Sequence, residues 1–164
     1  PTVAYIAAVQ QIKRMNMKKL IIGVLLASTA MTVDSVEYRK HVDSMTDKDK
    51  SYVYIPEALC SRRCGSIVVR AGGDVYINTS RYIGDYKYPM DVRFDKGEVK
   101  KLNYITSTKG TSLFLRKSDI AEFIKNIKKS NQVLIKTYNY KGTPETKTYK
   151  LSGANLEINK ISGF

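Results

Sequence analysis

From Tyr52 onward the chain reads as short strands separated by turns, and this pattern limits the possible folds more than any other feature. Residues 66–71 (SIVVRA) form an apolar run, and Gly72-Gly73-Asp74 predicts a hairpin turn into 74–80, where apolar and polar residues alternate. An alternating strand offers one face to a core and the other to water. The frequent Val, Ile, Thr and Tyr also favour β-structure.

One amphipathic helix is predicted at about 119–130, with Ser118 as its N-cap. Its apolar residues at i, i+3, i+4 and i+7 form one stripe: Ile120, Phe123, Ile124 and Ile127. The other expected strands lie at 52–55, 90–95, 98–107, 112–116, 132–140 and 145–153, and 155–161 reads as a strand or a short helix. The predicted fold class is α+β, mostly β: one antiparallel, sandwich-like domain over 52–164 with the helix packed on it.

Residues 17–30 have the features of a secretory signal peptide. Lys18 and Lys19 precede the apolar run 20–27, which is too short to span a bilayer as a helix. Ser28 and Ala30 are small residues at the spacing of a cleavage site, so we expect cleavage after Ala30. A buried amphipathic helix is the alternative, but the run has no polar face. The processed protein is therefore expected in the periplasm.

The segments on either side of this signal are expected to lie outside the folded domain. Residues 1–16 precede Met17 and are interpreted as an upstream extension that is not native; Met15 is a second candidate start. Residues 31–51 are polar without a sustained period, which predicts a mobile N-terminus or one short helix.

Cys60 and Cys64 are the only cysteines, and an even count in an exported chain predicts a disulfide. His41 is the only histidine and lies in a different, polar segment, so neither a metal site nor histidine-assisted nucleophilic catalysis is expected. No glycine-rich phosphate loop or hydrolase motif occurs. We therefore expect a protein that is not an enzyme and has no cofactor.

Two surface patches are candidate binding sites. The chain carries a net charge of +13, and residues 1–30 contain four basic and no acidic residues, which leaves +9 after cleavage. A basic excess points either to a polyanionic partner or to a solvated lysine-rich surface. The first patch is the tyrosine-rich loop with Arg81, Tyr82, Tyr86, Lys87 and Tyr88. The second is the basic helix face with Lys125, Lys128 and Lys129.

The order of motifs over residues 66–161 resembles the exported VasI/TagO-type proteins associated with type VI secretion. The shared features are a strand that ends in an arginine (Val68-Val69-Arg70), an Arg-Phe-Asp strand (93–95), a serine turn (107–110), a short helix, and a closing Tyr-x-Leu-Ser-Gly (149–153). The resemblance implies an accessory protein of the envelope without catalytic residues. Arg93 and Asp95 share a strand face, which suggests a cross-strand ion pair.

The preferred hypothesis is a periplasmic accessory protein that acts by contact with an envelope protein. One alternative is an inhibitor of an envelope-active enzyme such as lysozyme, with Lys109 as the residue that plugs its site. Another is a binder of anionic lipid or lipopolysaccharide through a weak electrostatic surface. Nucleic acid is not expected as a partner, because the export signal removes the protein from it. Membrane contact is otherwise expected only through the signal peptide.

Overall fold

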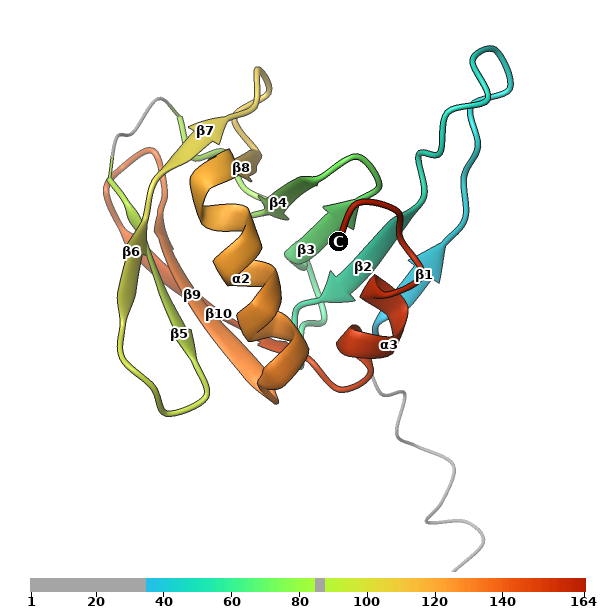
Figure 1. Cartoon of the computed structure of the whole chain (residues 1–164). Coiled ribbons are helices and arrows are strands. Elements are labelled where there is room, and N and C mark those ends of the chain that lie inside the picture. The colour runs from blue at the N-terminus through green and yellow to red at the C-terminus, as the bar shows by residue number, and fades with distance from the viewer. Residues whose placement is uncertain (1–34, 85–87) are drawn as a thin grey trace, which may run out of the picture. The chain divides into compact units, whose positions relative to one another are not determined.

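Two antiparallel sheets make up the computed structural model, which describes residues 35–84 and 88–164 (Figure 1). The larger sheet has the order β1-β2-β3-β4-β8-β7, with β1 (Glu37–Arg39), β2 (Tyr52–Pro56), β3 (Ser66–Arg70), β4 (Asp74–Asn78), β8 (Ser112–Leu115) and β7 (Tyr104–Thr106). The smaller has the order β10-β9-β5-β6, with β10 (Pro144–Lys150), β9 (Gln132–Tyr138), β5 (Met90–Phe94) and β6 (Lys100–Leu102). The predicted mostly-β α+β class is confirmed.

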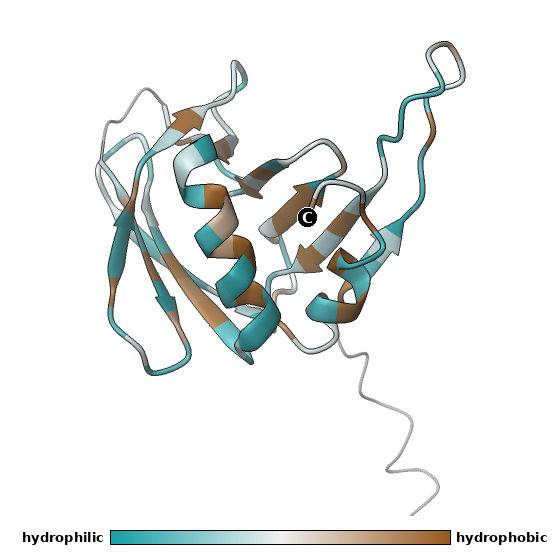
Figure 2. Cartoon of the chain, in the orientation of Figure 1, coloured by the Kyte–Doolittle hydropathy of each residue, from teal (hydrophilic) through white to brown (hydrophobic). Residues whose placement is uncertain are grey.

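The predicted helix is α2 (Lys117–Lys129), and all four residues of its apolar stripe are buried. They join side chains from both sheets in one hydrophobic core. A second, short helix, α3 (Ala154–Ile158), packs beside α2. Figure 1 shows α2 lying between the smaller sheet and the strands β3 and β4, and Figure 2 shows that the middle of β3 is apolar whereas β6 is mostly polar.

The predicted Ser118 cap is wrong. The helix begins two residues earlier, with Arg116 at the N-cap position in an extended conformation and with no side-chain cap hydrogen bond. Ser118 lies within the first turn, where its hydroxyl contacts the Asp119 carboxylate at 3.2 Å. Burial of the apolar stripe, rather than a cap, therefore supplies the stability of this helix.

The segment 98–107, predicted as one strand, forms two strands in different sheets. Lys100 of β6 pairs with Val92 of β5, whereas Ile105 of β7 pairs with Phe114 of β8. The chain thus crosses from the smaller sheet to the larger one at Asn103. The N-terminal segment also differs from the short helix considered above, because residues 37–39 form β1 and pair with β2.

One corner joins the two sheets beside the disulfide loop. Glu57, directly after β2, forms an antiparallel bridge with Tyr149 of β10, and the Ala58 amide donates to the Thr148 carbonyl at 2.8 Å. The Lys147 side chain is only 5 % exposed, and its ammonium lies 2.6 Å from the Glu57 carboxylate. That carboxylate also accepts the Gly65 amide at 2.6 Å. A buried ion pair therefore sits where the sheets meet.

The Tyr149 hydroxyl is buried at the same corner and has no hydrogen-bond partner within the described part of the chain. A Cβ on Gly65 would come within 2.8 Å of this oxygen, so the corner has room only for glycine there. Burial, reinforced by the carboxylates of Glu57 and Glu145, raises the pKa of the Tyr149 phenol well above its ordinary value. The phenol is therefore held neutral in the folded protein.

Tyr149→Phe is expected to raise the free energy of unfolding at pH 7 by about 1 kcal/mol, because an unpaired buried hydroxyl retains its desolvation penalty. In the unfolded chain a tyrosine ionises near pH 10, so the wild-type protein loses stability as pH rises above about 10 while Tyr149 stays neutral in the fold. The variant lacks this loss, so its advantage should grow above pH 10. Urea titrations at pH 7 and pH 11 measure both effects. A variant less stable than wild type at pH 7 would show that the hydroxyl is paired.

Candidate functional site

Four tyrosines gather where the smaller sheet ends, and we call them the tyrosine patch: Tyr82, Tyr88, Tyr138 and Tyr140. The rings form two pairs, Tyr82 with Tyr140 at a centroid distance of 6.1 Å and Tyr88 with Tyr138 at 5.1 Å. The two segments meet because β5 pairs with β9, with Asp91 opposite Lys136, so the residues before β5 lie beside those after β9. The sequence analysis predicted Tyr82 and Tyr88 but missed Tyr138 and Tyr140. The only local sign of these two is that they stand two residues apart at the end of a strand.

Two glycines with left-handed backbone make room for these rings. A Cβ on Gly110 (φ +65°) would come within 2.4 Å of the Tyr82 ring, and one on Gly84 (φ +73°) within 3.3 Å of the Tyr140 Cβ. Tyr82 and Tyr140 are nevertheless 55 % and 53 % exposed. The patch is thus a supported aromatic surface with faces open to solvent.

Cations surround the patch. The Lys141 ammonium lies 5.5 Å from the centroid of the Tyr140 ring, and the Lys136 ammonium 5.9 Å from that of Tyr138. Lys136 also lies 2.6 Å from the Asp91 carboxylate, which raises the pKa of the lysine. Arg81 lies 3.7 Å from Glu145 and keeps about half of its side chain exposed. The rings thus lie next to ammonium and guanidinium groups, and two of these three cations, Lys136 and Arg81, are paired with carboxylates.

The structure separates the two predicted patches. Tyr86 and Lys87 lie outside the described residues. The helix lysines are on the C-terminal half of α2, where Lys125 and Lys129 are exposed and Lys128 is half-buried. That end of α2 leads into the start of β9, and the patch lies at the other end of this strand. The seven residues of β9 place the two about 20 Å apart.

Of two other sequence predictions, the structure confirms one and contradicts the other. The Cys60–Cys64 disulfide is confirmed. The predicted Arg93–Asp95 ion pair is wrong, because the Asp95 carboxylate instead accepts hydrogen bonds from the backbone amides of Asn131 and Gln132, each at 3.0 Å.

Lys109 is exposed in the predicted 107–110 turn, which the Gly110 amide closes by donating to the Ser107 carbonyl at 2.8 Å. The turn thus borders the tyrosine patch through Gly110.

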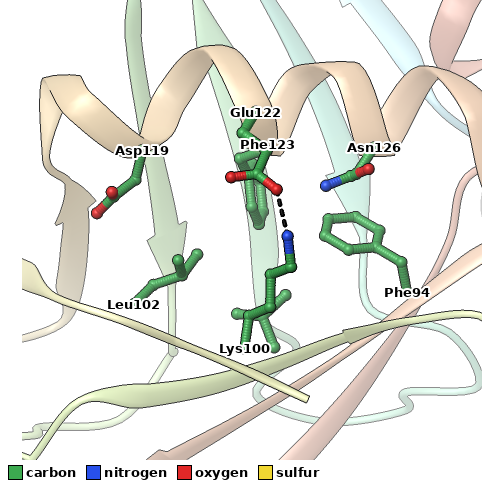
Figure 3. Close-up of a pocket in the computed structure, with 8 residues that line it drawn as sticks. Phe94, Lys100, Leu102, Asp119, Glu122, Phe123 and Asn126 are labelled. Carbon is green, nitrogen blue, oxygen red and sulfur yellow. Dashed lines mark hydrogen bonds and ion pairs between the residues drawn. The ribbon is translucent and has the colours of Figure 1, made fainter. Parts of the chain in front are cut away.

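A small cavity under α2 is not a ligand site. It measures about 30 Å³ and lies between α2 and the strands β5 and β6 (Figure 3). Phe94 and Phe123 meet edge to face at 5.5 Å on its inner side, and an ion pair between Lys100 and Glu122 spans it. A space of this size holds about one water molecule.

Among the described residues, no three His, Cys, Asp or Glu side chains are placed to hold a metal ion. Within the same residues, no helix is both long and apolar enough to cross a bilayer.

The fold defines the class of this protein as a β-rich α+β domain with two antiparallel sheets and one packed helix. No protein-family model and no curated protein matches the chain. Among solved structures, it is similar in fold to the crystal structure of invasion associated protein B from Bartonella henselae. That similarity has a TM-score of 0.51 at 14% sequence identity, and it covers 77% of this chain and 94% of the other.

Proposed function

We propose that this protein acts outside the cytoplasm as a non-enzymatic accessory protein that binds a cell-envelope protein through the tyrosine patch. The observation that carries the proposal is the meeting of four tyrosine rings from two distant segments, framed by Arg81, Lys136 and Lys141. Tyrosine and arginine dominate the binding energy of many protein interfaces because they bury a large area with few rotatable bonds. The net charge of +9 that remains after cleavage of residues 1–30 favours an acidic partner.

Two further lines support the location and the partner. The signal-like segment 17–30 and the Cys60–Cys64 disulfide both fit an oxidising compartment. The resemblance to VasI/TagO-type proteins supports a partner in the type VI secretion apparatus.

Site-specific photocrosslinking in the producing cell tests this proposal. A p-benzoylphenylalanine placed at Tyr140 should crosslink to one envelope protein, identified by mass spectrometry of a periplasmic extract. The matched control carries the same group at Leu156 of α3, which is 69% exposed and lies outside the patch. The double change Tyr82→Ala and Tyr88→Ala should lower the yield at position 140 by at least about tenfold, because it removes two aromatic anchors.

Equal crosslinking from positions 140 and 156 would contradict the proposal, as would a yield unaffected by the double change. Recovery of the protein only from the cytoplasm would contradict export. The double variant should keep the wild-type unfolding midpoint, since about half of each of the two replaced side chains is exposed.

A further inference from the structure

The outer face of the smaller sheet carries a groove of about 210 Å³, which we call the outer groove. It is lined by Asp91, Val92, Arg93, Val99, Leu134, Lys136 and Thr146. Strand register explains this set, because Arg93 lies opposite Leu134, and Lys136 lies between Asp91 and Thr146. Leu134 and Lys136 alternate with the buried Val133 and Ile135, so they face away from the core, whereas Val92 is itself a buried core residue.

The groove has an apolar part and a cationic part. Leu134 is half-buried, and Val99 is 58% exposed although it stands next to the sheet. Arg93 is exposed and forms no ion pair within the described residues, whereas Lys136 is already paired with Asp91. An incoming carboxylate therefore finds Arg93 available, and a guanidinium can hold it through two parallel hydrogen bonds.

The volume of the groove limits its occupant. Sites for whole small molecules usually measure about 300–1,000 Å³. A groove of 210 Å³ is below that range and suits one large apolar side chain, as in the central pocket of a protein interface.

The outer groove is continuous with the tyrosine patch. Lys136 lines the groove, and its ammonium lies 5.9 Å from the Tyr138 ring, which in turn contacts Tyr88. A partner segment in extended conformation advances about 3.3 Å per residue, so a few residues reach from Leu134 to the patch.

We propose that the outer groove is the anchor pocket for an extended, acidic segment of the partner protein. The segment inserts one large aliphatic or aromatic side chain against Val99 and Leu134 and places a neighbouring carboxylate on Arg93. This assignment rests on the proposed function, because it takes the partner to be a protein with an acidic surface.

Fluorescence polarisation with three labelled octapeptides tests the pocket on the processed chain. The first peptide has a central leucine between glutamates, the second has glycine in place of leucine, and the third has glutamines in place of the glutamates. The leucine peptide should bind about tenfold more tightly than the glycine peptide, which corresponds to partial burial of one leucine. The glutamine peptide should bind more weakly than the leucine peptide by a similar factor, because Arg93 loses its carboxylate.

Two variants and a control connect the binding to the groove. Val99→Asp should abolish the preference for leucine without changing the unfolding midpoint, since Val99 is 58% exposed. Arg93→Gln should abolish the preference for glutamate over glutamine. Lys129→Gln, which removes one charge from the far end of α2, should leave both preferences intact.

The other outcomes separate this proposal from the proposed function. Equal affinity for the leucine and glycine peptides would overturn the anchor pocket, while the crosslinking at Tyr140 would remain as the test of the patch. Direct binding of decanoate, measured by calorimetry and abolished by Val99→Asp, together with no binding of the leucine peptide, would show an aliphatic acid as the ligand and would also overturn the proposal. Peptide binding that depends on Val99 but not on Tyr82 or Tyr88 would support the groove and count against the patch.

Discussion

Lys147→Met is expected to lower the free energy of unfolding by about 3–5 kcal/mol, because it leaves the Glu57 carboxylate without its cation at the joint between the two sheets. Methionine keeps most of the volume of the lysine stem, so the loss would come from the missing charge rather than from a cavity. Urea titration at pH 7 measures the effect. An unchanged slope of the free energy of unfolding against urea concentration would show that the two-state transition is preserved.

The control for this variant is Lys150→Met, three residues further along β10. Lys150 is exposed, so the same change there should alter the stability by less than about 0.5 kcal/mol. Combining Lys147→Met with Glu57→Gln should cost less than the sum of the single changes, because glutamine can still accept the Gly65 amide without an unpaired charge. A loss below about 1 kcal/mol for Lys147→Met would mean that the buried pair does not hold this corner together.

Phe123→Ala should destabilise the fold by about 3–5 kcal/mol, the usual range for truncating a fully buried phenylalanine. Phe123 is 2 % exposed and meets Phe94 of β5 edge to face, so it connects α2 to the smaller sheet. Thermal and urea unfolding followed by circular dichroism measure the loss.

The neighbouring Glu122 supplies a matched comparison on the same turn of helix, as Figure 3 shows. Its side chain is 62 % exposed and pairs with Lys100, and an ion pair this exposed to solvent adds little to stability. Glu122→Ala should therefore be nearly neutral. Similar losses for the two variants would contradict the placement of the helix on the core.

Local sequence pattern was enough to predict an element whose structure depends on residues close together in the chain. The spacing of Ile120, Phe123, Ile124 and Ile127 identified α2 and its buried face, and the glycine turn at 72–73 located the β3–β4 hairpin. Cys60 and Cys64 are close enough in sequence to pair within one loop. In each case the partners are a few residues apart, so little of the fold needs to be known.

Local sequence pattern predicted only half of the tyrosine patch. Tyr82 and Tyr88 stand in one tyrosine-rich loop, but Tyr138 and Tyr140 join them through the register that places Asp91 opposite Lys136. The outer groove depends on the same register, since Arg93 and Leu134 are neighbours only across the strand pair. Cross-strand neighbours are set by pairing, and pairing between distant segments leaves no local mark in the sequence.

By itself, the sequence determined the β-rich class, the position of the one long helix, the disulfide and a basic surface with clustered tyrosines. Only the tertiary structure decided that 98–107 divides between two sheets, that Lys147 turns inward to Glu57, and that four tyrosines meet beside an open groove. The physical reason is that periodicity shows which residues avoid water, whereas the choice of partner for each strand edge and each buried charge depends on contacts between residues far apart in the chain.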